Sequence, residues 1–312
     1  ADCTFYGMGK SAANAPLELL MLYLNEKKKK NYDVSQVLEA IDNVIMEIYH
    51  KQYWGYNMFF YISASTHCHP NYVSYFMNKK TLSVKQITDI LRSLKFEKKL
   101  MYDAKYAEQV YLEYQSIECD DVEAIKELQK QFAGHEVLLI GPGNNIKRQK
   151  TKVRKYIDDK QPLIVAVNYV PGDIKIDYVF LTKSKRYTQL MNDLKGSVNA
   201  KVDIIATSNV TKSAGCFKYV LNYSSLIDKE TEIIDNSLVM LLKAMRQVHV
   251  SRVSLAGFDG YSRRSDNYFD VSREYGFAKE KAAYLNAYVK DFLTFNKEIQ
   301  VEFITRSYYN VK

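Results

Sequence analysis

Apolar positions along the chain change their period near residue 116. Before that point they recur every three or four residues, and Ser, Asp or Pro stands at the start of each segment. This spacing is typical of amphipathic helices with capped N-termini. We expect helices at 16–28, 35–48, 70–77, 84–94 and 103–114. Because we find no strand pattern of note here, the first part predicts a helical bundle.

After residue 120, short apolar runs rich in β-branched residues alternate with helical segments. We expect strands at 137–140, 163–168, 178–181, 203–206, 219–222, 252–256 and 300–304. The helices expected between and around them are 120–132, 146–157, 184–194, 233–248 and 273–295. Such alternation predicts an open, mostly parallel sheet with helices on both faces, a Rossmann-like arrangement. The predicted fold class is therefore α/β, with domains at 1–116 and 117–312.

The most informative local pattern follows the strand expected at 137–140. The chain continues with Gly141-Pro142-Gly143-Asn144-Asn145 and then a basic helical stretch. A strand, a glycine turn and a helix N-terminus can present backbone N–H groups to a phosphate, and glycine allows close approach of the backbone. The pattern matches neither the dinucleotide-binding fingerprint GxGxxG nor the P-loop fingerprint GxxxxGK[ST]. We interpret Gly141, Gly143, Asn144 and Asn145 as a phosphate site, with a tight turn that binds no ligand as the alternative.

Further polar residues stand where other strands end. Asn168 and Asp259 follow strands, Tyr261 comes shortly after, and Asn236 and Ser237 lie in the long helical segment. Because the carboxyl ends of parallel strands share one edge of a sheet, we expect these residues to converge there. In this hypothesis they bind a nucleotide, with Asn168 on the ribose or base and Tyr261 or Tyr268 stacking, and Asp259 is a candidate catalytic residue. The alternative is that they are ordinary loop-forming residues.

Composition narrows the class of protein. The chain has 312 residues, of which 47% are hydrophobic, as expected for a globular protein rather than a disordered one. No apolar run approaches the ~18 residues that a membrane-spanning helix needs, so we expect no membrane partner. The four cysteines show no CxxC spacing, and we interpret them as reduced thiols of a cytoplasmic protein.

A basic net charge is typical of nucleic-acid binding and a cluster of His and Cys is typical of metal binding, but we expect neither ligand here. The net charge of +8 could favour nucleic acid, but the lysines are spread over helices and no nucleic-acid module accompanies them. An anionic small molecule suits the same charge. His67-Cys68-His69-Pro70 contains good zinc ligands, but no second cluster completes a site. We therefore predict no metal site and interpret this segment as a packed turn before a helix.

The first third of the chain resembles a known family. Residues 4–18, which include Gly7, Gly9, Asn14 and Glu18, resemble the end of the last barrel strand and the following segment of the 4-hydroxy-2-oxovalerate aldolase family, among the HMG-CoA-lyase-like TIM barrels. Ala13 stands where that family usually has Gly. The region to about residue 115 resembles the helical extension behind such barrels, and the chain starts like a piece of a longer protein.

The aldolase resemblance implies a carbon–carbon lyase whose divalent metal ligands, base and substrate arginine lie on barrel strands upstream of residue 1. It therefore implies no cofactor and no aldolase activity in these 312 residues. The aldolase barrel of the full-length chain is the implied partner, and a homo-oligomer is compatible with it.

The second part is similar to a Rossmann-like group that includes bacterial sialyltransferases and pterin pyrophosphokinase-like domains. The shared pattern is the glycine turn at 141–145, Asn168, Asn236-Ser237, and the segment 255–261. In the sialyltransferases these positions bind a cytidine sugar nucleotide. This resemblance implies nucleotide or nucleotide-sugar binding. Because no histidine follows His249, the catalytic histidine of that group has no counterpart. A glycosyl or pyrophosphoryl transferase and a non-catalytic nucleotide sensor remain the alternative functions.

Overall fold

The structure is a computed structural model that describes residues 2–9, 13–79, 81–213, 215–270, 274 and 278–310. The chain divides into two compact units. One comprises residues 1–75 with 91–104, and the other comprises 76–90 with 105–312. Residues 76–90 and 105–115, which belong to the first of the expected domains, thus fall in the compact unit that holds the sheet, and the domain boundary expected at residue 116 stays a prediction.

The second unit contains a seven-stranded sheet, and every pairing between its described strands is parallel. The order across the sheet is β7-β6-β5-β4-β3-β8-β9. The strands are β3 (Val137–Ile140), β4 (Leu163–Val167), β5 (Tyr178–Leu181), β6 (Asp203–Thr207), β7 (Tyr219–Leu221), β8 (Arg252–Ala256) and β9 (Gln300–Phe303). The predicted α/β fold class is confirmed.

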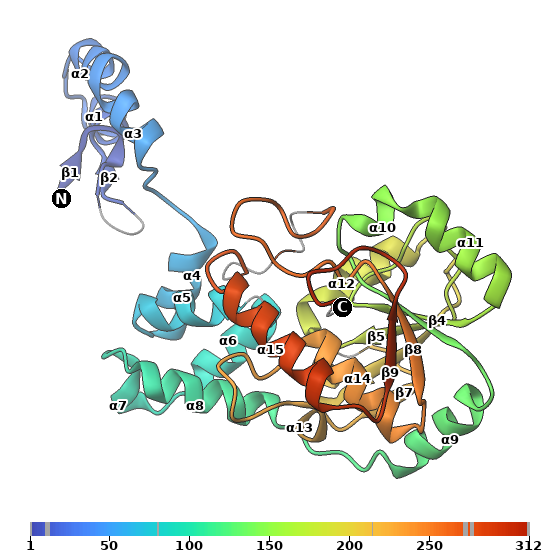
Figure 1. Ribbon diagram of the computed structural model, residues 1–312. Helices are drawn as coiled ribbons and strands as arrows, with labels where there is room; N and C mark the ends of the chain where they lie inside the picture. The colour runs from blue at the N-terminus through green and yellow to red at the C-terminus, as the bar shows by residue number, and fades with distance from the viewer. Residues whose placement is uncertain are drawn as a thin grey trace. The chain divides into compact units, whose positions relative to one another are not determined.

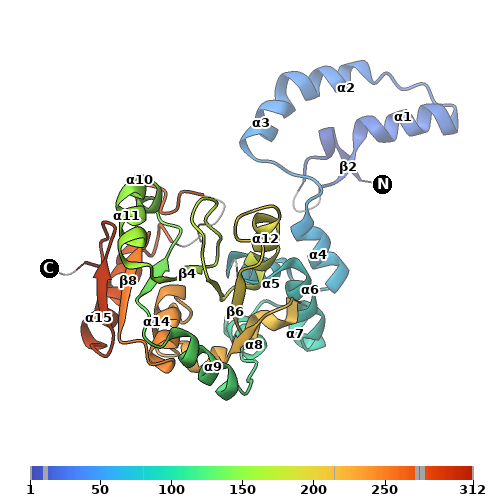
Figure 2. The same cartoon turned by 90° about the vertical axis from the view of Figure 1, so that its right-hand side faces the viewer.

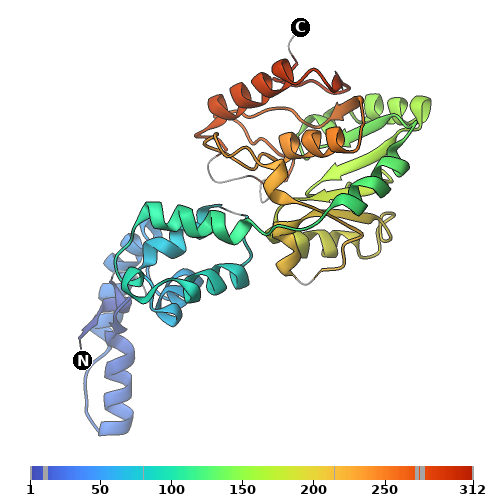
Figure 3. The ribbon, with the colours of Figure 1, turned by 90° about the horizontal axis from the view of Figure 1, so that it is seen from below.

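Helices cover both faces of this sheet because its strands are apolar on both sides. Val137 and Leu139 of β3 face one core, whereas Leu138 and Ile140 face the other. The first core is covered by α9 (Val122–Phe132), α14 (Ser237–Gln247) and α15 (Ala282–Phe295), and the second by α11 (Lys150–Lys160) and α12 (Ser184–Leu194). Figure 1 shows α14 and α15 on the near side of the strands, and Figure 3 shows the layers from below.

The direction in which the chain crosses the sheet reverses once, between β3 and β8. From β3 the chain adds β4, β5, β6 and β7 on one side, and it then returns to place β8 and β9 on the other side of β3. The loops after β3 and β8 therefore leave the same edge toward opposite faces. In open α/β sheets such a reversal creates the crevice where ligands bind.

The structure describes ten further helices. They are α1 (Leu17–Lys28), α2 (Ser35–Ala40), α3 (Met46–Lys51), α4 (Met58–Thr66), α5 (Pro70–Lys79), α6 (Val84–Ser93), α7 (Phe96–Lys99), α8 (Ala104–Gln115), α10 (Asn145–Arg148) and α13 (Tyr223–Leu226). Ser83 and Gln86 form a reciprocal capping box at the start of α6, in which each side chain accepts the other residue's backbone N–H. A π-helical turn, Ile41–Ile45, joins α2 to α3, and two short strands, Cys3–Thr4 and Ala15–Pro16, pair in parallel.

Several elements differ from the sequence expectation. The helix expected at 233–248 begins at Ser237, because Asn236 is its N-cap and accepts the backbone N–H groups of Leu238 and Val239. The helix expected at 146–157 is split into α10 and α11. The helix expected at 273–295 is described from Ala282, and part of the expected span lies outside the described residues. Helix α4 was not predicted.

Candidate functional site

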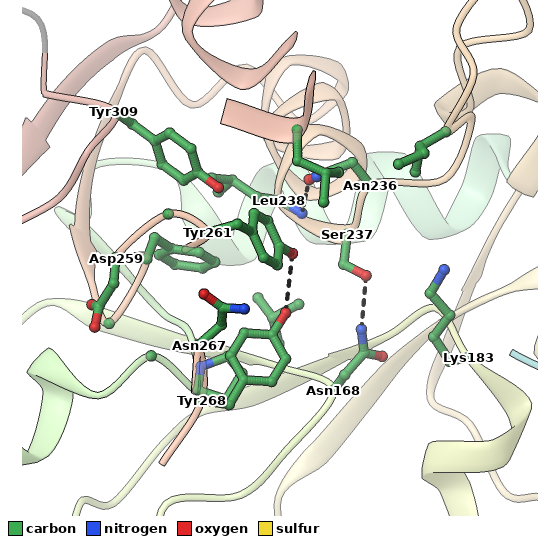
Figure 4. A pocket seen from close by; sticks show the side chains of 18 of the residues that line it. Asn168, Lys183, Asn236, Ser237, Leu238, Asp259, Tyr261, Asn267, Tyr268 and Tyr309 are labelled. Atoms are coloured by element: carbon green, nitrogen blue, oxygen red, sulfur yellow. Dashed lines mark hydrogen bonds between the residues drawn. The ribbon is translucent and has the colours of Figure 1, made fainter. Parts of the chain in front are cut away.

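A cavity lies at the carboxyl edge of the sheet where the crossing direction reverses. We call it the switch cavity. Its walls come from the ends of β3, β4, β5 and β8, from the start of α14, and from the segments around Asn267 and Tyr309. Figure 4 shows these side chains converging from segments far apart in the sequence. Six of the predicted site residues line it: Gly143, Asn168, Asn236, Ser237, Asp259 and Tyr261.

Asn168 joins three of the elements around the switch cavity. Its backbone is left-handed, with a φ of 57°, a conformation that asparagine tolerates better than most residues. Its side-chain Nδ2 donates to Thr182 Oγ1 at 3.0 Å and to Ser237 Oγ at 2.9 Å, and its Oδ1 accepts the backbone N–H of Thr182 at 2.9 Å. The end of β4 is therefore fixed to the end of β5 and to the first turn of α14.

A buried ion pair supports the wall beside Ser237. Lys183 Nζ lies 2.5 Å from Asp235 Oδ2, and the two side chains are 3% and 12% exposed. Lys183 follows β5, whereas Asp235 immediately precedes the N-cap of α14. Because a buried charge without a counter-charge is costly, this pair ties the two loops together.

The glycine turn after β3 has partners for its backbone N–H groups within the protein. Gly141 N–H donates to Ala256 O and Gly143 N–H donates to Gly257 O, both at 2.8 Å. Asn145 N–H donates to Asp259 Oδ2 at 2.7 Å. These glycines permit a very close approach, since a Cβ on Gly143 would lie 2.5 Å from Gly257 O and 2.6 Å from Asp259 Cγ. The turn packs against the loop after β8, and its amides are already engaged.

Asp259 is a half-buried carboxyl group on the wall of the switch cavity. One of its oxygens, Oδ2, accepts the Asn145 N–H, while Oδ1 is buried and has no hydrogen-bond partner among the described residues. Burial raises the pKa of Asp259 to about 6, and the Asn145 N–H and the charge of Arg148 oppose this shift. A carboxyl group with a raised pKa and an unpartnered oxygen at a cavity wall is a candidate acid or base.

Two tyrosines cross the switch cavity. The hydroxyls of Tyr261 and Tyr268 lie 3.1 Å apart, and their ring centroids are 6.3 Å apart (Figure 4). Asn286 holds the backbone of Tyr261 through two hydrogen bonds of 2.8 Å. The cavity volume is about 70 Å³. Because ligand pockets usually exceed roughly 300 Å³, a ligand larger than a few water molecules requires the tyrosines to separate.

The remaining predicted residues lie nearby. Gly141 is buried behind the turn, and Asn144 and Asn145 line a neighbouring cavity on the other side of the Asp259 loop. Four polar residues of the switch cavity were not predicted as site residues: Lys183, Arg186, Asn267 and Tyr309. The first two follow the strand expected at 178–181, so their place after a strand end was an available signal. Asn267 and Tyr309 carried no such signal.

The next two features are candidate metal ligands and candidate membrane-spanning helices. No group of His, Cys, Asp and Glu in the described part of the chain could hold a metal ion. His67 ends α4 with a φ of 54°, and Cys68 is buried in the turn before α5. Among the helices that the structure describes, none is long and apolar enough to cross a membrane.

No family model, curated protein or solved structure matches this chain. Function is therefore inferred from the geometry and chemistry of the site itself.

Proposed function

We propose that residues 117–312 bind a nucleotide or nucleotide sugar in the switch cavity. The observation that carries this proposal is the position of the cavity, at the carboxyl edge of an all-parallel sheet where the crossing direction reverses. Open α/β sheets bind mononucleotides and dinucleotides at this place. The lining adds aromatic rings, Tyr261 and Tyr268, and polar groups, Asn168 and Ser237, which is the mixture that ligand sites use.

The proposed roles follow from the contacts. Once the hydroxyls of Tyr261 and Tyr268 separate, their rings offer faces on which a base can stack. The side chains of Asn168 and Ser237 can exchange their mutual hydrogen bond for bonds to the ribose or the base. The backbone N–H groups of the glycine turn already donate to β8 and its loop, so the phosphates require other hydrogen-bond donors or a cationic side chain.

A thermal-shift screen tests this proposal. The panel is CMP, UDP, GDP and ADP, their sugar conjugates, and a pterin. A ligand at 100 times its dissociation constant adds about 2.7 kcal/mol to the free energy of unfolding. We expect at least one nucleotide to raise the melting temperature. If none of them does, the switch cavity is not a nucleotide site.

A transferase on an activated sugar or a pyrophosphate is the second candidate, and Asp259 favours it. With a pKa of about 6, its carboxyl group is ionised at neutral pH and can accept a proton from an attacking hydroxyl while the nucleotide leaves with the bonding electrons. Transfer or hydrolysis that is lost in Asp259→Asn, with nucleotide binding retained, would support this role. Full activity in that variant would remove Asp259 from the mechanism, and binding without turnover in the wild type would favour a nucleotide sensor.

For residues 1–115 we propose the helical extension of an aldolase-type barrel that a longer chain supplies. The supporting observation is that large apolar side chains are exposed on α1 and on the run from α2 to α3, the helices whose ribbons Figure 2 shows. Neither α1, α2 nor α3 contains a buried residue, and Leu19 and Val44 are 59% and 55% exposed. We expect cleavage of 4-hydroxy-2-oxoacids with a divalent metal from the full-length protein and none from these 312 residues. Inactivity of both would contradict the proposal.

All four cysteines are free, which supports a reducing compartment. We therefore place the protein in the cytoplasm.

A further inference from the structure

A second cavity lies beside the switch cavity, and the loop that carries Asp259 separates the two. Its volume is about 370 Å³. The carboxyl ends of β3, β8 and β9 supply its walls through Arg148, Asp266 and Arg306, together with serine and asparagine side chains. Asp259, Gly260 and Asn267 line both cavities. We call this second space the arginine cavity.

Its charge is positive. Among the described residues, no carboxylate lies within ion-pair distance of Arg148 or Arg306. The two acidic side chains of the wall already have partners. Asp266 Oδ1 pairs with Lys279 Nζ at 2.7 Å, and Asp259 Oδ2 accepts the N–H of Asn145. Arg148, Arg306 and the Lys279 partner of Asp266 outnumber the two carboxylates Asp259 and Asp266, so the cavity has a net positive charge, which favours an anion there.

The loops that hold the arginines are fixed to one another. Asn145 Nδ2 donates to Arg306 O at 2.9 Å, and Tyr308 N–H donates to Asp259 O at 2.8 Å. Ser307 Oγ donates to Phe258 O at 2.6 Å. The segment after β9 is thus fastened both to the start of α10 and to the Asp259 loop. This bonding restrains the backbone of Arg306, and it sets the segment after β9 beside the helix that ends at Arg148.

We propose that the arginine cavity binds a phosphate-type oxyanion through Arg148 and Arg306. A guanidinium group donates two parallel hydrogen bonds to a phosphate, and two such groups on one cavity suit a phosphate or pyrophosphate. The anion belongs either to a nucleotide whose base occupies the switch cavity or to a separate phosphorylated substrate. The first source rests on the proposed function, whereas binding of the oxyanion itself does not.

Isothermal titration calorimetry at low ionic strength tests this proposal with inorganic pyrophosphate as the probe. We expect the wild type to bind pyrophosphate and the double variant Arg148→Ala/Arg306→Ala to bind it at least tenfold more weakly. Arg252→Ala is the matched control, because Arg252 is an exposed arginine at the amino end of β8, on the opposite edge of the sheet. The control is expected to stay within twofold of the wild type.

Titration with a nucleoside and with its diphosphate distinguishes the two sources. If the double variant weakens binding of the diphosphate but not of the nucleoside, the nucleotide's own phosphates occupy the arginine cavity. If it weakens pyrophosphate binding and leaves the diphosphate unchanged, the anion belongs to a separate substrate. Arginine-dependent pyrophosphate binding without any nucleotide binding would leave this proposal standing and refute the proposed function.

Absence of pyrophosphate binding by the wild type would overturn the proposal, as would an equal loss in Arg148→Ala/Arg306→Ala and Arg252→Ala. Circular dichroism spectra and melting temperatures establish that the variants fold. The conservative double variant Arg148→Lys/Arg306→Lys keeps both positive charges but cannot form bidentate hydrogen bonds. We therefore expect it to bind pyrophosphate with intermediate affinity.

Discussion

Asp259 Oδ2 accepts the backbone N–H of Asn145 at 2.7 Å, so a carboxylate occupies the position where the sequence suggested a phosphate. A glycine turn before a helix attracts anions through its N–H groups. Here the loop after β8 provides the anion from within the protein. The glycines at 141, 143 and 257 let the two loops approach closely enough for this contact.

The raised pKa of Asp259 predicts a pH-dependent stability. The folded protein holds the Asp259 proton up to a pH of about 6, whereas the unfolded chain releases it near the ordinary value of 3.8. Between these values the native state binds more protons, so the free energy of unfolding falls as the pH rises from about 4 to about 6. Asp259→Asn removes this dependence.

Chemical denaturation of both proteins at several pH values measures the effect. The difference in unfolding free energy between wild type and Asp259→Asn is expected to change by up to about 3 kcal/mol over this range, from the shift of the pKa. A difference that stays constant from pH 4 to pH 6 would show that Asp259 titrates normally.

Gly143→Ala should destabilise the fold. Its Cβ would meet Gly257 O at 2.5 Å, and this backbone atom cannot move without disturbing β8. We expect a loss of about 1–3 kcal/mol, as for other overpacked sites. Gly172→Ala is the matched control, because a Cβ there meets no atom within 4 Å. Equal stability of the two variants in urea would contradict the close packing of the two loops.

The Lys183–Asp235 pair predicts a non-additive double-mutant cycle. Lys183→Met leaves Asp235 as a charge with 12% exposure, and we expect the free energy of unfolding to drop by about 3–5 kcal/mol. Adding Asp235→Asn removes that charge and should recover part of the loss. If the double variant is less stable than Lys183→Met alone, the ion pair does not have this role.

The sequence predicted the sheet better than the site. Val137–Ile140, Tyr178–Leu181 and Arg252–Ala256 were predicted with the bounds that the structure has, since each is a short segment rich in apolar residues. The start of α14 was placed too early because Ile233 and Ile234 continue the helical spacing, whereas Asn236 is the N-cap. Local spacing does not reveal which of two adjacent polar residues caps a helix.

The contacts at the site could not be predicted from the sequence, because they depend on which strands pair. The carbonyl groups that engage Gly141 and Gly143 belong to residues more than 100 positions away, and they lie opposite because β8 pairs with β3. The same holds for Arg148 and Arg306, which line one cavity only because β9 lies beyond β8.

Calorimetric titration of the Asn168→Gly variant with the nucleotide that most stabilises the wild type examines the switch cavity most directly. Glycine adopts the φ of 57° without strain, so this variant removes the side chain alone. Gln161→Gly is the control, since Gln161 has a φ of 46° and lies before the other end of β4. We predict at least tenfold weaker binding for Asn168→Gly and unchanged binding for Gln161→Gly. Equal affinities of the two variants would contradict a nucleotide site in the switch cavity.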